Sequence, residues 1–400
     1  MRRLFDLVPS PAERKPLTGE SFLQELLPVI VLYYVTAFLV VTRGTLAIRV
    51  ALLPVTLWAA FRAATGLRVD AGNPRLVYWN QALVLAMTTL GMRVIIWTCQ
   101  PEHYVRHTSQ TSCDHKPSAN RRIWDALDLC GNVRGIGWNW SNGLHLPKET
   151  RSISRAAFAS TTALQCVCWV LAFDFVHFSV QFFDPGFALP TGASIYDMSL
   201  PPIPRYLRSS MICFLAGLTF WSAIQMLYHV GTLVGILVLQ QHPSQWPPVF
   251  GNPLLADSLS DYWAKRWHQL FRQCFVSLGF KPLSFFAGRA GGVLGAFFIS
   301  GMLHDFALWG MGRGSEPSSM YTYFLMMGVG VVLEGFWKYV TGYRVGGILG
   351  RIWGVVWLTG WSHLFIDAYC RKGVVASIFF PDAYRPSLVL LRFVQRILML

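Results

Sequence analysis

The sequence FFISGMLHDFALW, residues 297–309, lies inside an apolar run that extends over about 284–310. Such a run is longer than the roughly 20 residues that a membrane-spanning helix needs. Within residues 297–309, two ionisable side chains, His304 and Asp305, interrupt the run. An ionisable group at bilayer depth costs on the order of 2.5–3.5 kcal/mol unless it faces protein, a partner or water. The pair therefore indicates a functional site; the alternative is a histidine that packs between helices and bonds to a neighbour.

The composition of the whole chain extends this interpretation. Of its 400 residues, 53% are hydrophobic and only 14% are charged, whereas a soluble domain carries roughly 25% charged residues. Apolar runs recur along the chain, with polar segments between them. We therefore expect an all-α, polytopic transmembrane helix bundle rather than two or three soluble domains.

The apolar runs define the expected spans. The stretch at the C-terminus is either a last span or an interfacial helix, which makes the count eight or nine. Residues 1–21 are predicted to form a polar tail, and residues 22–400 a single integral-membrane domain. Spans are expected at about 26–42, 45–61, 76–98, 156–180, 209–240, 284–310, 320–341, 346–369 and 386–400.

The net charge of +14 comes from Lys and Arg side chains that fall mostly between the apolar runs. This distribution is typical of loops that fix a membrane topology and contact anionic lipid, and we do not expect a nucleic-acid partner. The basic excess in 99–155 and 242–283 predicts that both long polar regions face the cytosol. Because no apolar run precedes about Leu26, the first span is expected to act as an uncleaved signal, which indicates the endoplasmic reticulum membrane.

The eight cysteines are scattered and include no CxxC pair, so neither a disulfide scaffold nor a zinc ribbon is indicated. Asn139 begins a formal N-glycosylation sequon, and whether it is modified stays open. One group of Cys and His residues has spacings that match no standard zinc pattern, and we expect no metal site. That group consists of Cys99, His103, His107, Cys113 and His115.

The segment DSLSDYWAKRWH, residues 257–268, combines tryptophans with basic residues and ends in a histidine. Ser258 or Ser260 can cap a helix that we expect to follow and to continue through His268. Trp263 and Trp267 then share one side of this helix. The alternative is an interfacial helix whose tryptophans lie at headgroup level and whose basic residues face anionic lipid.

His268 and His304 are the two candidates for chemistry. His304 lies about 36 residues beyond His268, which is enough for a loop and a re-entry into the membrane, so the two can meet in one cavity. The chain has no GxSxG, HExxH, P-loop or GxGxxG pattern in a suitable context. A buried histidine without a nucleophile partner predicts general-base chemistry on a substrate hydroxyl, to which an unperturbed pKa of about 6.5 is suited.

Three motifs carry a family resemblance. The pattern Tyr-Trp-x-x-Arg-Trp-His at 262–268, followed by Ser-Gly-Met-Leu-His at 300–304, resembles the signature of membrane-bound O-acyltransferases. The closest branch is the wax synthase-like group of fungi and plants, and RGIGWNW at 134–140 is similar to its fungal members. The resemblance covers roughly residues 120–370.

The resemblance implies helices packed around a tunnel, with acyl-CoA entering from the cytosol and the acceptor from the membrane. The family's catalytic histidine falls on His304. Its second polar residue, an Asn in the sterol and diacylglycerol branches, falls on His268. That departure fits the wax synthase-like branch and leaves open whether His268 assists chemistry or shapes the CoA mouth. The expected substrate-binding residues are Trp263, Lys265, Arg266, Trp267 and Arg272, with the basic ones holding the CoA phosphates.

The resemblance also implies the reaction. We expect acetyl transfer from acetyl-CoA, a co-substrate rather than a bound cofactor, to a hydroxyl of a terpenoid or meroterpenoid secondary metabolite. His304 would deprotonate this lipophilic alcohol, and no acyl-enzyme would form. A long-chain wax or sterol ester synthase using a longer acyl-CoA is the first alternative. The oligomeric state stays open.

Two alternatives belong to other classes. A non-catalytic assembly protein is one. A membrane transporter is the other, because it would use intramembrane ionisable side chains as an ion path. Besides His304 and Asp305, the expected spans hold Asp174, His177, His229, Glu334 and His363.

Overall fold

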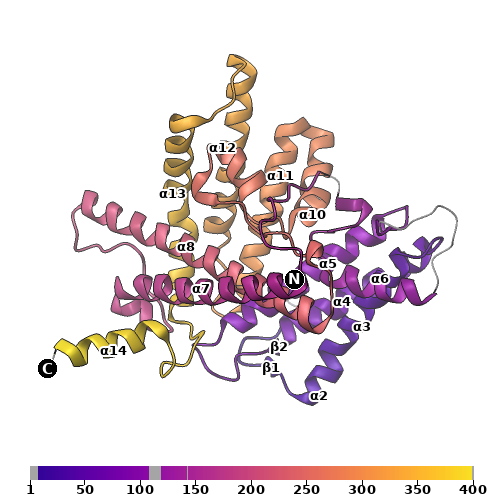
Figure 1. Cartoon of the computed structure of the whole chain (residues 1–400), viewed down its shortest axis with the longest axis horizontal. Helices are drawn as coiled ribbons and strands as arrows, with labels where there is room; N and C mark the ends of the chain where they lie inside the picture. Colours follow the sequence, from indigo (N-terminus) through magenta and orange to yellow (C-terminus); the bar gives the residue numbers. More distant parts are fainter. Residues whose placement is uncertain (1–7, 108–118, 142, 399–400) are drawn as a thin grey trace. The chain divides into compact units, whose positions relative to one another are not determined.

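The computed structural model describes residues 8–107, 119–141 and 143–398 (Figure 1). Within these residues most of the chain is helical. Two strands of two residues each, β1 (Lys15–Pro16) and β2 (Leu67–Arg68), pair in parallel with Lys15 opposite Leu67. The expected all-α fold is therefore confirmed.

Seven helical runs in the described part of the chain are long and apolar enough to cross a membrane. They coincide with the first seven expected spans, so the protein is an integral membrane protein. Each run is at least as long as the roughly 20 residues that the hydrocarbon core demands. The runs are Gly19–Val40, Leu46–Gly66, Tyr78–Cys99, Arg155–Phe182, Pro202–Val238, Arg272–Gly310 and Pro317–Thr341.

The last two expected spans differ from the structure. At 346–369 the chain forms α13 (Gly347–Arg371), which is long enough to span but is less apolar than the seven runs and is not among them. At 386–400 it forms α14 (Pro386–Leu398), whose 13 residues are too few to cross. The second case fits the interfacial alternative.

The chain divides into two compact units, and each is described by itself. Unit 1 comprises Met1–Leu144 and Gln269–Val332, and unit 2 comprises His145–His268 and Leu333–Leu400. One boundary falls inside α12 (Pro317–Thr341).

Unit 1 holds the first helices and the helix that carries His304. Besides β1, β2 and the first part of α12, its elements are α2 (Gly19–Ser21), η1 (Phe22–Leu26), α3 (Leu27–Val40), α4 (Leu46–Gly66), α5 (Tyr78–Cys99), α6 (Ala119–Gly131), η2 (Asn139–Ser141), α10 (Arg272–Phe275), η8 (Val276–Phe280) and α11 (Lys281–Gly310).

Unit 2 holds the tryptophan-rich segment. Besides the end of α12 with α13 and α14, its elements are α7 (Arg155–Phe182), η3 (Pro185–Ala188), α8 (Pro202–Leu233), η4 (Val234–Val238), η5 (Pro243–Gln245), η6 (Pro253–Leu255), α9 (Leu259–Asp261), η7 (Tyr262–Arg266) and η9 (Val374–Ala376). Helices α7 and α8 pack along each other, and α13 packs on α8.

In unit 1, α5 packs against α4 and α11, and α3 packs against α4 and α6. Glycines allow the close packing of η8 on α11. A Cβ on Gly295 would lie 2.5 Å from the carbonyl oxygen of Gly279, and one on Gly292 would lie 2.9 Å from the Phe280 ring. Helix α11 is broken near its start, where Gly288 has φ 60° and ψ −161°, a conformation that is essentially restricted to glycine.

Buried arginines donate to the C-terminal carbonyls of two helices of unit 1, α6 and α5. Arg93, on α5, is 2% exposed and donates to the Leu129 carbonyl at the end of α6 over 2.6 Å. Arg49 donates in the same way to the carbonyls of Trp97 and Gln100 at the end of α5. A cation at a helix C-terminus is favoured because the last carbonyls carry partial negative charge and have no partner within the helix. These contacts explain how arginines are accommodated in apolar helices.

Candidate functional site

His304 lies on α11 and is half-buried. Its Nδ1 is 2.7 Å from the carbonyl oxygen of Ser300, one helical turn earlier. A carbonyl oxygen can only accept, so Nδ1 carries the hydrogen and donates it. The neutral ring then has its lone pair on Nε2, which makes Nε2 the nitrogen that can take a proton from a substrate.

The His304 ring is also held from the side. It packs against the Phe324 ring of α12, with ring centroids 4.5 Å apart and an angle of 31° between the planes. The two helices approach closely here because residue 301 is glycine: a Cβ on Gly301 would lie 3.4 Å from the Cα of Tyr321. The backbone bond and the aromatic contact together restrict the rotation of the imidazole.

Asp305, the neighbouring carboxylate, serves another purpose. It is 6% exposed, and its Oδ1 accepts the backbone N–H of Glu316 over 2.9 Å. Glu316 immediately precedes α12, so Asp305 fixes the loop between α11 and α12. Successive side chains on a helix point in different directions, which agrees with separate roles for His304 and Asp305.

In unit 2, the tryptophan-rich segment starts at a capped helix. The Ser258 side chain accepts the backbone N–H of Asp261 over 3.0 Å, as expected for an N-cap serine. The carboxylate of Glu334, on α12, accepts the N–H groups of Leu259 and Ser260 over 2.7 and 2.8 Å. Trp353 of α13 donates its indole N–H to the same carboxylate over 3.1 Å.

The expectation that this helix continues through His268 is wrong. After α9 the chain forms a π-helix, η7, in which the N–H of Trp267 bonds to the carbonyl of Tyr262 over 2.7 Å. Trp267 itself has an extended backbone, with φ −73° and ψ 151°. The i to i+5 spacing stacks Tyr262 on Trp267, with centroids 5.4 Å apart and planes at 20°. Trp263 and Trp267 still meet, but edge to face.

His268 lies among aromatic rings of unit 2. Its ring centroid is 5.6 Å from that of Phe250, at nearly a right angle, and 5.5 Å from that of Trp267. Phe250 and Trp267 also pack edge to face at 5.1 Å. The histidine is thus surrounded by ring faces and edges that limit its orientations.

The expected CoA-binding cations are held to different degrees. Lys265 is 55% exposed, and its Nζ lies 3.5 Å from Asp261. Arg266 bonds to the Asp261 carboxylate and also donates to the Asn252 carbonyl. Burial alone would raise the pKa of Asp261, but the hydrogen bonds from Arg266 and from the Asp257 backbone N–H, together with the charges of Arg266 and Lys265, outweigh it and lower the pKa. Arg266 is therefore the more constrained of the two.

The structure brings together five of the expected site residues. Trp263, Lys265, Arg266, Trp267 and His268 form one continuous segment of unit 2. Arg272 and His304 belong to unit 1, where Arg272 begins α10 and lies near Gly143. The contacts within each unit do not test whether His268 and His304 meet in one site, and this therefore stays a prediction.

Two residues that position these segments were not assigned to the site from the sequence. Phe324 gave no signal, because an aromatic residue in an apolar helix is usually core. Glu334 did give one, since a carboxylate in an apolar run requires a partner, but backbone N–H groups as that partner could not be read from the sequence. Among the described residues no group of three or more His, Cys, Asp or Glu is placed to hold a metal ion; Cys113 and His115 lie outside those residues.

Comparisons with known proteins identify similar chains. Residues 246–327 match the model of the membrane bound O-acyl transferase family. Acetyltransferase spyB of Aspergillus fumigatus is 25% identical over 60% of this chain and 46% of its own length. Acetyltransferase pyr8 of the same species is 24% identical over 90% of this chain and 87% of its own length. A probable long-chain-alcohol O-fatty-acyltransferase 2 of Arabidopsis thaliana is 30% identical over 42% of this chain and 46% of its own length. The chain thus spans about half the length of the first and third of these relatives.

Proposed function

We propose that this chain, a member of the membrane bound O-acyl transferase family, transfers an acyl group from acyl-CoA to the hydroxyl of a lipophilic alcohol. One observation carries the proposal: Nδ1 of His304 donates to the Ser300 carbonyl, so the neutral ring presents Nε2 as a base. The family match at 246–327 includes both His268 and His304, which supports the same assignment.

In the proposed mechanism, Nε2 of His304 takes the proton of the acceptor hydroxyl. The oxygen attacks the thioester carbonyl and forms the new C–O bond, and the negative charge moves to the carbonyl oxygen. When that charge returns, the C–S bond breaks and the sulfur receives the proton from Nε2. The histidine is regenerated and no acyl-enzyme forms. His268 is proposed to stabilise the oxyanion or to shape the CoA entrance.

Donor binding is proposed for the segment before His268 and for Arg272. Lys265 can reach a phosphate at little cost because its pair with Asp261 is exposed and long. Arg266 and Arg272 would add charge-assisted hydrogen bonds, with Trp263 and Trp267 packing against the CoA.

The acyl group is proposed to be acetyl and the acceptor a terpenoid or meroterpenoid, with the reaction at the endoplasmic reticulum membrane. Two of the relatives are named acetyltransferases, which favours the short acyl group. The Arabidopsis relative is named a probable long-chain-alcohol O-fatty-acyltransferase, so a wax or sterol ester synthase is the second candidate.

Transport by an ion path is less well supported by the contacts in unit 2. A path needs ionisable side chains that can exchange partners. Each candidate instead bonds to another group of the same unit. The pairs are Asp174 with Arg385, His177 with the Val375 carbonyl, His229 with Gln165, Glu334 with the Leu259 N–H, and His363 with the Thr359 carbonyl.

A microsomal assay tests the proposal. Membranes containing the chain are given acetyl-CoA or palmitoyl-CoA together with a panel of terpenoid, sterol and long-chain alcohols, and CoA thiol and ester products are measured. Ester formed from acetyl-CoA and a terpenoid alcohol supports the first candidate, and ester formed only from palmitoyl-CoA supports the second. Ion flux with no CoA release from any pair would contradict acyl transfer.

A further inference from the structure

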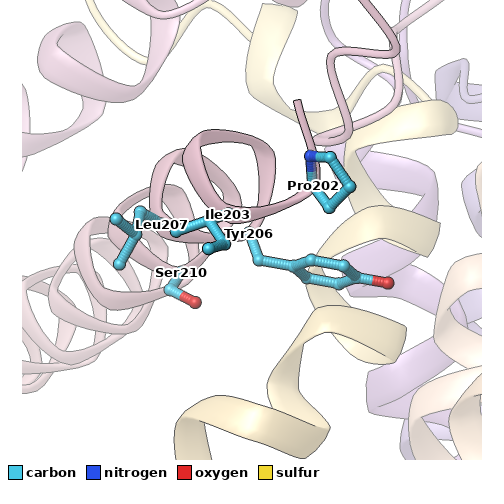
Figure 2. A pocket seen from close by; sticks show the side chains of 5 residues that line it. All are labelled: Pro202, Ile203, Tyr206, Leu207 and Ser210. Carbon is cyan, nitrogen blue, oxygen red and sulfur yellow. The ribbon is translucent and has the colours of Figure 1, made fainter. Parts of the chain in front are cut away.

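A small pocket in unit 2 lies beside the first turns of α8, and none of the residues that line it is assigned to the site above. It has a volume of about 280 Å³ and is lined by Pro202, Ile203, Tyr206, Leu207 and Ser210 (Figure 2). The pocket is shallow and open, because Ile203, Tyr206 and Leu207 are 74%, 57% and 68% exposed. Three of the five lining side chains are apolar, and the polar groups are the hydroxyls of Tyr206 and Ser210; Figure 2 shows the Tyr206 hydroxyl at the end of its ring that points away from Ser210.

Ser210 is part of a directed chain of hydrogen bonds. Its Oγ lies 3.3 Å from Nε2 of His363, which is on α13. Nδ1 of the same ring lies 2.9 Å from the Thr359 carbonyl oxygen. Because that carbonyl can only accept, Nδ1 carries the hydrogen of the neutral ring and Nε2 carries the lone pair.

Ser209, the neighbouring serine, does not donate a hydrogen to this lone pair, so the lone pair accepts from Ser210. Ser209 Oγ is fully buried and also lies 3.1 Å from Nε2, but it donates its hydrogen to the Tyr206 carbonyl over 3.1 Å. Ser210 is therefore the donor to Nε2. Its own oxygen keeps its lone pairs for a group in the pocket, and it cannot donate there at the same time.

The imidazole is fixed by aromatic contacts. Tyr196 stacks on the His363 ring with centroids 6.0 Å apart and planes at 15°. Tyr206, a pocket residue, meets the ring edge to face at 6.3 Å. The packing of α8 and α13 thus fixes the orientation of the His363 ring, and with it the direction in which the hydrogen bonds of this chain are donated.

We propose that this pocket binds a membrane-dissolved alcohol whose hydroxyl donates a hydrogen bond to Ser210 and whose apolar body lies against Ile203, Tyr206 and Leu207. The pocket is at the N-terminal end of a span, where aromatic side chains and lipid hydroxyl groups meet the headgroup level. An acceptor-only oxygen selects a ligand O–H donor, so an ether of the same shape binds less well. The site uses no residue of the proposed acyl transfer.

Photolabelling tests the site in the full chain with His304→Ala, so that labelling does not depend on turnover. The probe is a diazirine analogue of farnesol, and the competitors are farnesol and farnesyl methyl ether. We expect label in the peptide containing residues 202–210 and about fivefold better competition by farnesol, the factor that one neutral hydrogen bond of ~1 kcal/mol provides. Equal competition by the ether would overturn the proposal.

Matched variants separate binding from folding. Leu207→Trp should fill the pocket and remove the label, whereas Leu227→Trp, at a position on the same helix that is 64% exposed, should keep it. Ser210→Ala should abolish the preference for alcohol over ether, and Ser210→Thr, which retains the hydroxyl, should preserve it. Unchanged label in Leu207→Trp, or an intact preference in Ser210→Ala, would show that the alcohol binds elsewhere.

Discussion

Nδ1 of His304 donates its hydrogen to the carbonyl oxygen of Ser300 over 2.7 Å. The bond leaves Nε2 as the base, and general-base catalysis contributes roughly 10²–10⁴-fold to a rate. We expect His304→Ala to lower CoA release by about this factor while the protein remains in the membrane. The check is to measure the CoA thiol that the purified variant releases, with its melting temperature measured in parallel.

The matched control for His304 is its neighbour. Asp305→Asn keeps an oxygen that can accept the Glu316 N–H, so most of the turnover should remain. Equal losses in both variants would show that the site is sensitive to any change in this part of α11, and the assignment of His304 as the base would fail.

The packing of η8 on α11 depends on the absence of a side chain at Gly295. In Gly295→Ala the new methyl group would overlap the Gly279 carbonyl, and such overpacking typically costs about 1–3 kcal/mol. We expect a lower midpoint of thermal unfolding. Gly217→Ala, on α8 with nothing within 4 Å of its Cβ, should be neutral or slightly stabilising. A loss of similar size at Gly217 would contradict the packing argument.

Arg93 should matter more than a surface arginine. Arg93→Met removes the donor to the Leu129 carbonyl and leaves the end of α6 without its cation. Hydrogen bonds to charged groups contribute about 1.5–3 kcal/mol, and a loss in that range should appear in denaturation of the protein in detergent. Arg121→Met, which breaks a half-exposed pair with Asp125, should change the stability by well under ~1 kcal/mol.

Glu334 anchors the segment that carries the expected donor-binding residues. In Glu334→Gln an amide NH₂ would face one of the N–H donors, so α9 should loosen. We expect trypsin to cleave faster after Lys265 and Arg266, and mass spectrometry of the peptides measures the cleavage rate. The control is Asp257→Asn, because Asp257 pairs with Arg351 at an exposed position. Cleavage rates that do not distinguish the two variants would refute this role of Glu334.

Acid should loosen the same segment through Asp261. Its lowered pKa means that the folded state favours the carboxylate. This contribution is fully present above the unfolded pKa of about 3.9 and is lost as pH falls through the lower folded pKa. Brief pepsin digestion should therefore cut within 257–268 increasingly as pH drops below about 4. Asp261→Asn should be cut more readily at the upper end of the range and respond less to acid; an unaltered acid response in it would assign the effect to another group.

The seven apolar runs could be predicted because bilayer thickness fixes the length of a spanning helix and composition reveals it. His304 stood out for the same reason, as an ionisable group in one of these runs. Whether α13 spans the membrane was not recoverable in this way, because residues such as Arg351 and His363 make it less apolar than the seven runs.

Other features depend on contacts between distant segments. The π-helix at 262–266 differs from an α-helix by one residue in its hydrogen bond, and the carboxylate of Glu334 that holds the start of the preceding helix α9 comes from α12. The partner of Arg93 is a backbone carbonyl, and every residue has one. The local sequence pattern therefore cannot predict the contact that Glu334 makes or the contact that Arg93 makes.

The contacts of the buried arginines can form only in a certain order during synthesis, because the chain is made from its N-terminus. Arg49 meets Gln100 only 51 residues later, and Arg93 meets Leu129 after a further 36 residues of synthesis. Arg14 donates to the Gly310 carbonyl across a separation of 296 residues. Each guanidinium thus leaves the ribosome before its acceptor exists. The nascent protein must shelter three cations in turn, and the Arg14 side chain reaches its acceptor only once residue 310 has been translated.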